Sequence, residues 1–153
     1  KIAILAADGV NEKSLNEVKK ALMAEGAAVE IIAPNLGSIQ TDTGTAITVD
    51  ESLLTAASVF YDAVYLPGGK QSVATLATEP DAIHFLNEAF KHCKAIAADE
   101  GAKQVINETY FAAMAADEGI IISSKAKDLA SNFIKAIAQH RFWDREKARK
   151  VPA

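Results

Sequence analysis

Short, nearly unbroken apolar runs recur along the chain, and they constrain its fold more than any other feature. Segments with helical periodicity separate them, so we expect strands and helices to alternate. An apolar run without polar alternation is typical of a strand covered on both faces, as in a parallel sheet. The pattern predicts an α/β fold, a three-layer sandwich with a mostly parallel central sheet. The predicted strands are residues 1–6, 29–33, 62–66, 95–98 and 120–123.

Three segments, two between these runs and one after the last of them, carry apolar residues at helical spacing. Local signals mark their ends: Asn11 can cap the first helix, Gly26 can end it in a left-handed conformation, and Pro80 suits the first turn of the second. A helix between two buried strands forms a βαβ unit with a right-handed crossover. The helical stripes are Leu15, Val18 and Leu22; Ile83, Leu86, Phe90 and Cys93; and Leu129, Phe133, Ile134 and Ile137.

Residues 37–49 depart from this pattern. Two short alternating stretches flank a turn at Asp42–Gly44, which predicts a β-hairpin excursion from the sheet. The length of 153 residues fits a single domain. We expect a folded body over residues 1–140 and a tail over 141–153. The chain opens at Lys1 inside an apolar run, without an initiator Met, as expected of a piece of a longer protein.

Composition excludes several classes of function. A net charge of -4 argues against a general nucleic-acid binder. No apolar run reaches the roughly 18 residues of a membrane span, and no secretory signal is present. A single cysteine excludes an internal disulfide framework and a multi-Cys metal site. We therefore expect a cytoplasmic protein without nucleic-acid or membrane partners.

The tail has its own charge and composition. Every arginine lies in it, whereas the rest of the chain is acidic. Aromatic residues beside arginine are typical of interface anchors. We expect the tail to dock on a partner, with a solvated extension, or a tail folded back over the domain's own helices, as the alternatives. The residues expected at this interface are Arg141, Phe142, Trp143 and Arg145.

A ligand site is expected where the strands end. Open α/β sheets bind ligands beyond the carboxyl ends of their strands, where the strand order reverses. The loops over residues 7–11, 67–71 and 99–101 would reach that place. Their glycines let the backbone approach a ligand closely, or they only form tight strand-to-helix turns. The expected pocket residues are Asp8, Gly68, Gly69 and Gly101.

Familiar catalytic and phosphate-binding signatures are absent from the sequence. There is no P-loop, no dinucleotide fingerprint and no serine nucleophile elbow. Cys93 falls on an apolar stripe, which favours a structural role over a nucleophilic one. The three histidines are scattered and too far apart to share a metal, so no metal site is predicted. Asp99 and Glu100 form the best acidic pair, at an expected helix start.

Four segments carry a resemblance to a known superfamily. They are Lys1–Leu5, Glu30–Pro34, Thr41–Gly44 and Tyr61–Gly69, in which the strand-ending Ala-Pro and Pro-Gly-Gly are the more specific pieces. Together they resemble the class I glutamine-amidotransferase-like superfamily, in its intracellular protease and deglycase branch. The resemblance spans about residues 1–140. It implies a flavodoxin-like sandwich.

The same resemblance implies that the catalytic groups are gone. Enzymes of that branch use a cysteine at the turn after strand four, assisted by a histidine and by a glutamate near strand one. Here Asp99 or Glu100 stands where the thiol would be, and Ser14 stands at the glutamate position. A carboxylate cannot supply the thiolate on which such chemistry relies. We expect a vestigial nucleophile elbow and no catalytic residue.

A narrower resemblance concerns the end of the chain. Residues 138–153, with their His-Arg-Phe-Trp run and final Val-Pro-Ala, and the segment Phe90–Lys94 resemble the C-terminus of large-subunit catalases of the hydroperoxidase II type. The resemblance implies a domain without a cofactor of its own. Its partners would be the haem-bearing body and sister subunits of a homotetrameric parent enzyme that decomposes hydrogen peroxide. The domain would contribute stability, assembly and substrate access.

Other functions stay open at this point. The runner-up is a stand-alone enzyme of the protease, deglycase or glyoxalase type, which the missing thiol disfavours. A chaperone-like module is a further alternative. A flavin or nucleotide carrier is suggested only by analogy with the fold.

Overall fold

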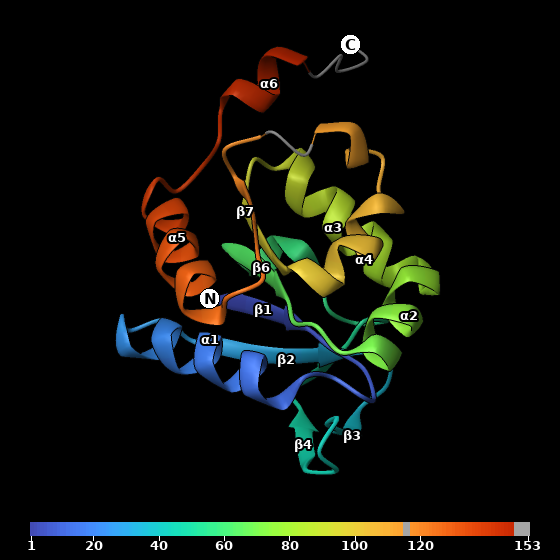
Figure 1. Cartoon of the computed structure of the whole chain (residues 1–153). Coiled ribbons are helices and arrows are strands. Elements are labelled where there is room, and N and C mark those ends of the chain that lie inside the picture. The colour runs from blue at the N-terminus through green and yellow to red at the C-terminus, as the bar shows by residue number, and fades with distance from the viewer. Residues whose placement is uncertain (115–116, 149–153) are drawn as a thin grey trace.

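The computed structural model describes residues 1–114 and 117–148, and it confirms the predicted α/β architecture (Figure 1). Within these residues, six parallel strands form one sheet in the order β5-β2-β1-β6-β7-β8. The strands are β1 (Ile2–Leu5), β2 (Val29–Ala33), β5 (Glu51–Ser52), β6 (Ala63–Leu66), β7 (Ala95–Asp99) and β8 (Ile120–Ser123).

Helices cover both faces of this sheet, which makes three layers. Figure 1 shows α1 and α5 on one face and α2, α3 and α4 on the other. The helices are α1 (Glu12–Ala24), α2 (Lys70–Thr78), α3 (Pro80–Lys91), α4 (Lys103–Asn107), α5 (Ala126–Ala138) and α6 (Asp144–Ala148). Short 3-10 turns are η1 (Ser58–Phe60), η2 (Glu100–Ala102) and η3 (Ala112–Met114).

Burial on both faces explains the unbroken apolar runs. Successive side chains of a strand point to opposite faces, so β1 feeds two cores. Ala3 and Leu5 pack among α2, α3 and α4, whereas Ile2 and Ile4 pack among α1 and α5. All four side chains are buried. A polar residue at any of these positions would lie in one core or the other.

The expected end signals are present. The Asn11 side chain accepts a hydrogen bond from the Ser14 N–H at 2.8 Å and so caps α1. Gly26 follows the end of α1 with φ +83°, and Pro80 is the first residue of α3. The prediction for Cys93 was wrong in one respect. The helix ends at Lys91, and Cys93 lies beyond it in a left-handed conformation (φ 59°), although its side chain is buried as expected.

The predicted hairpin is confirmed. Strands β3 (Gly37–Gln40) and β4 (Ala46–Val49) pair antiparallel, and the bridge between Val10 and Thr41 joins them to the loop after β1. The sequence patterns missed β5, α2 and α4. These elements are short, and tertiary packing outweighs weak local preference in such segments.

The tail contacts the body through Phe142 and Arg145. Phe142 is buried, and its backbone N–H donates to the Cys93 carbonyl at 2.8 Å. Arg141 precedes α6, so it does not lie on the same helix as Arg145. Arg149 lies outside the described residues.

Candidate functional site

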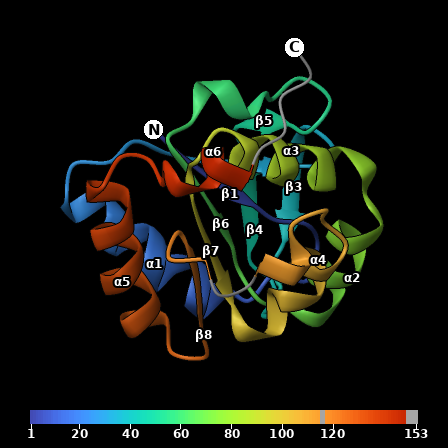
Figure 2. The same cartoon turned by 90° about the horizontal axis from the view of Figure 1, so that it is seen from above.

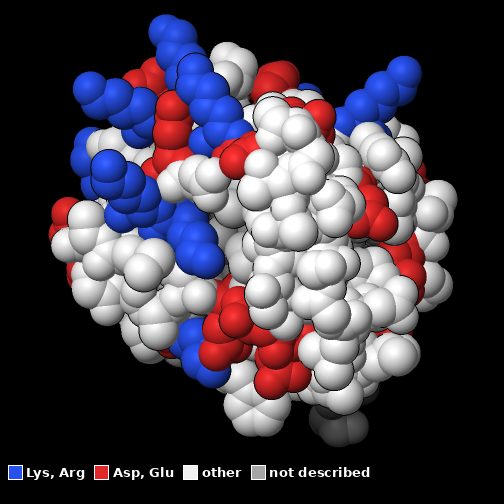
Figure 3. Space-filling view, turned by 90° about the horizontal axis from the view of Figure 1, so that it is seen from below, with Lys and Arg blue, Asp and Glu red and all other residues white. Residues whose placement is uncertain are grey.

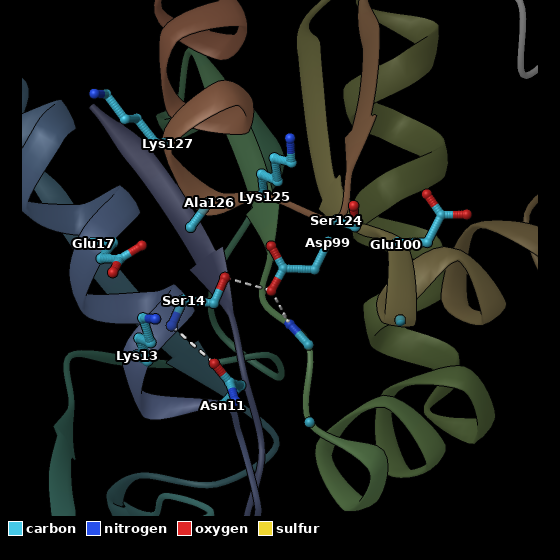
Figure 4. A pocket seen from close by; sticks show the side chains of 13 residues that line it. Asn11, Lys13, Ser14, Glu17, Asp99, Glu100, Ser124, Lys125, Ala126 and Lys127 are labelled. Atoms are coloured by element: carbon cyan, nitrogen blue, oxygen red, sulfur yellow. Dashed lines mark hydrogen bonds between the residues drawn. The ribbon is translucent and has the colours of Figure 1, made fainter.

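A cleft of about 580 Å³ lies at the carboxyl ends of the strands, beside β1, where the strand order reverses. Four segments form it: the start of α1, the loops after β6 and β7, and the start of α5 (Figure 4). This is the position at which the topology predicts a ligand site. The lining residues are Asn11, Lys13, Ser14, Glu17, Gly68, Gly69, Asp99, Glu100, Gly101, Ser124, Lys125, Ala126 and Lys127.

Asp99, the last residue of β7, is the most heavily bonded side chain of the cleft. Its Oδ2 accepts hydrogen bonds from the Ser14 hydroxyl at 2.5 Å and from the Gly68 N–H at 2.7 Å. Its Oδ1 accepts from the Tyr65 hydroxyl at 2.9 Å. Figure 4 shows Ser14 and the loop backbone converging on this carboxylate. The polar groups that face the cleft here are therefore already bound to a group of the chain itself.

Tyr65 fixes the direction of one of these bonds. Its side chain is fully buried beneath the cleft. Burial raises the pKa of the Tyr65 phenol well above its usual value, and the neighbouring Asp99 charge raises it further. The phenol therefore keeps its proton over the ordinary pH range. It acts as a donor to Asp99 and cannot serve as a general base.

The glycines after β6 serve close packing of the chain on itself. Gly69 has φ +116°, and a Cβ there would lie 2.3 Å from the Gly9 carbonyl oxygen. The carbonyl oxygen of Gly68 accepts from the Asn11 N–H at 2.8 Å, while its own N–H is bound to Asp99. These contacts favour the tight-turn interpretation. By contrast, a Cβ at Gly101 would meet open space.

The structure brings Gly68, Gly69 and Gly101 together with Asp99 and Glu100 around the cleft. Asp8 does not line it. The Asp8 side chain is exposed and instead accepts a hydrogen bond from the Gln40 N–H at 2.8 Å, which ties the loop after β1 to the hairpin. The structure therefore places this expected pocket residue beside the hairpin and not in the lining of the cleft.

Sequence reasoning missed the wall contributed by α5. The segment Ser124–Lys127 follows β8, and the rule that predicted the other loops applies equally to it. Lysine and acidic side chains both line the cleft, as Figure 4 shows. Figure 3 shows the molecule from below, the side of the β3–β4 hairpin in Figure 1, and both signs of charge are visible on that face as well. The mixture of basic and acidic side chains in the cleft therefore favours neither a strongly anionic nor a strongly cationic ligand.

The described lining residues include no thiol, imidazole or serine–histidine pair. Cys93 lies at the opposite edge of the sheet and is 1% exposed. Neither Asp99 nor Glu100 has a positive φ. Across residues 1–114 and 117–148, no cluster of three or more ligating side chains could hold a metal ion. None of the described helices combines the length and apolar character that a membrane crossing requires.

The second constellation of interest is the anchor of the tail, at the amino ends of the strands. Arg145 is 8% exposed and makes a bidentate pair with Asp117, at 2.9 Å from Nε and 2.6 Å from Nη2. Its Nη1 donates to the Lys94 carbonyl at 2.7 Å. The guanidinium also lies 4.2 Å from the Phe90 ring centroid. This geometry combines a fork-shaped ion pair with stacking on an aromatic face.

Gly119 makes room for this anchor. A Cβ at Gly119 would lie 2.3 Å from Arg145 Nη2 and 2.5 Å from a Phe142 ring carbon. Burial alone would raise the pKa of Asp117, but hydrogen bonds from Arg145 and from the Gly119 N–H hold it below its usual value. Phe142 and Arg145 therefore contact their own domain, as in the fold-back alternative. Trp143, between them, is 66% exposed.

Comparisons with solved structures show the same fold elsewhere. Drosophila melanogaster DJ-1beta matches with a TM-score of 0.76 and 18% identity, over 96% of this chain and 93% of that one. A DJ-1 superfamily protein from Salmonella typhimurium matches with a TM-score of 0.71 and 19% identity, over 99% and 98% of the two chains. At these identities the likeness concerns the fold alone. It confirms the expected flavodoxin-like sandwich.

Sequence relatives identify the family. Catalase HPII of Pseudomonas aeruginosa is 34% identical over 100% of this chain, and Catalase-2 of Bacillus subtilis is 38% identical over 95% of it. The chain spans 21% of the length of each of these relatives. The model of the C-terminal domain found in long catalases matches residues 1–147. The chain therefore belongs to the family of C-terminal domains of long catalases.

Proposed function

We propose that this domain performs no catalysis and contributes stability and assembly to a long catalase. The observation that carries the proposal is that the Asp99 carboxylate accepts three hydrogen bonds from its own chain. Asp99 or Glu100 stands at the strand end where the resembling enzymes place a thiol, and the Asp99 carboxylate accepts hydrogen bonds from Gly68, Ser14 and Tyr65. A group held by three donors within its own chain is typical of a structural role.

The proposed parent enzyme carries haem and decomposes hydrogen peroxide, and the domain holds no haem. Haem iron is ligated by His, Cys, Met or Tyr, and the described residues that line the cleft include none of these. Tyr61 and Tyr65 are buried and donate to Glu30 and Asp99. Haem does not fit this cleft. The parent is proposed to act as a homotetramer in the cytoplasm, with the haem-bearing body and sister subunits as the domain's partners.

The first experiment addresses the domain itself. Purified residues 1–153 are incubated with hemin and scanned for a Soret band, and oxygen release from peroxide is then measured. We expect neither a stoichiometric band nor turnover. A tight one-to-one haem complex that releases oxygen rapidly would contradict the proposal.

The enzyme alternative is tested on the same preparation. Iodoacetamide labels an activated, accessible thiolate quickly at neutral pH, whereas a buried thiol reacts slowly. Because Cys93 is buried at the edge of the sheet opposite the cleft, we expect slow labelling and no methylglyoxal consumption. Rapid labelling together with turnover of methylglyoxal would favour the deglycase class. Among residues 1–114 and 117–148, no specific contact favours a flavin carrier or a chaperone.

A further inference from the structure

Exposed apolar side chains gather at one end of the molecule. The parallel strands all begin at the same edge of the sheet, opposite the cleft. Six of the eight large exposed hydrophobic residues within the described ranges come from segments at that edge. They are Met23 near the end of α1, Val59 and Phe60 in η1, Tyr110 and Met114 between α4 and β8, and Trp143 beside α6, whereas Leu36 and Leu54 lie elsewhere. We call these six residues the apolar end.

Trp143 is held outward by a fixed support. Its neighbour Phe142 and the nearby Arg145 are each 8% exposed and are bonded to the start of β7 through Cys93 and Lys94. Figure 2 shows α6 lying across the start of β7. Because the backbone on both sides of Trp143 is held in place, burying this side chain would require breaking the contacts of Phe142 or Arg145. Such residues are typical anchors of protein interfaces.

The first residue of the chain also lies at this end of the molecule. The Lys1 carbonyl accepts a hydrogen bond from the Asp62 N–H at 2.7 Å. Asp62 lies two residues after η1, whose last residue is Phe60. The Lys94 side chain donates to the Ser58 carbonyl of η1, and the Lys94 carbonyl accepts from Arg145 of the tail. The tail, η1 and the first residue therefore meet at one edge. In a longer chain, residues before Lys1 arrive beside the apolar end.

We propose that Trp143 and Phe60 anchor the polypeptide that precedes Lys1 in the long catalases. This inference rests on the proposed function and names the surface through which it acts. The chain covers 21% of the relatives' length, so most of such a protein lies outside it. A tether at Lys1 gives that preceding polypeptide a high effective concentration at this surface. A sister subunit has no such tether.

The test uses the full-length catalase with a photo-crosslinking benzoylphenylalanine in place of Trp143. Irradiation is expected to join position 143 to peptides that precede Lys1, within a product that keeps the mass of one chain. The matched control carries the same group at Leu36, which is 64% exposed but lies away from this edge. A product with the mass of two chains would assign the surface to a sister subunit and overturn the proposal. Crosslinks confined to residues 1–148, or none, would also overturn it.

A second readout measures the strength of the contact. Trp143→Ala in the full-length protein is expected to raise the rate of proteolytic cleavage before Lys1 about tenfold, the change given by losing one interface anchor. Leu36→Ala is expected to leave the rate unchanged. If Trp143→Ala behaves like Leu36→Ala while deletion of the whole domain still destabilises the enzyme, the surface is wrong and the proposed function stands.

Discussion

Replacement of Arg145 by alanine tests how firmly the tail is part of the domain. The substitution removes the bidentate pair with Asp117, the bond to the Lys94 carbonyl and the stacking on Phe90. The Asp117 side chain, 18% exposed, would lose its cation and keep only the Gly119 N–H. The perturbation therefore leaves a largely buried charge without its counter-ion.

The expected magnitude follows from these contacts. Breaking a buried ion pair by removing one partner costs about 3–5 kcal/mol, and residual access of water to Asp117 places the expectation at the lower end of that range. We expect a loss of about 3 kcal/mol in the free energy of unfolding. For a chain of this size, that corresponds to a fall of roughly 6–12 °C in the melting temperature.

The assay is urea denaturation of residues 1–153 followed by circular dichroism, with Arg141→Ala as the control. The Arg141 guanidinium donates to the carbonyl of its neighbour His140, so its loss is expected to change stability by less than about 0.5 kcal/mol. A loss below about 1 kcal/mol for Arg145→Ala would refute the reasoning, because the tail would then be a loosely attached segment.

Three further predictions concern the cleft and the anchor of the tail. Asp99→Ala is expected to lower the free energy of unfolding by about 1–3 kcal/mol, because buried donors lose their acceptor; a stabilised variant in urea denaturation would instead indicate a ligand site. Gly69→Ala is expected to reduce the yield of folded protein severely, since its Cβ would overlap backbone atoms, whereas Gly101→Ala, facing open space, should purify normally. Equal yields would contradict this. The lowered pKa of Asp117 means that its stabilising contribution is present above the ordinary carboxyl pKa and is lost as the pH falls through the lower folded-state value. The stability gap between the native chain and Asp117→Asn should therefore narrow in acid, and a gap that is independent of pH would exclude this linkage.

The sequence predicted the parts of the fold that depend on local pattern. Strand β1 was visible because both of its faces are buried, so every position had to be apolar. The cap at Asn11 and the left-handed Gly26 were visible because each requires a particular residue type. Helix α4 was not visible, because five residues carry too little periodicity.

The same holds for the site: the sequence predicts where its residues lie along the strands, but not the contacts between residues far apart in the chain. Topology placed Asp99 and Gly68 at one edge of the sheet, but the direct bond between them depends on side-chain geometry across 31 positions. The burial of Arg145 depends on Asp117, 28 positions away, and no local sequence pattern predicts such a partner. Phe142 and Trp143 look alike in sequence, although one is buried and the other exposed.

The most direct test of the central claim compares a full-length catalase of this family with the same enzyme truncated before Lys1. The rate of peroxide decomposition per haem is measured at 25 °C, and the half-life of activity is measured at an elevated temperature. The proposed function predicts an unchanged rate per haem and a shortened half-life. A lower rate per haem in the truncated enzyme, or an unchanged half-life, would contradict it.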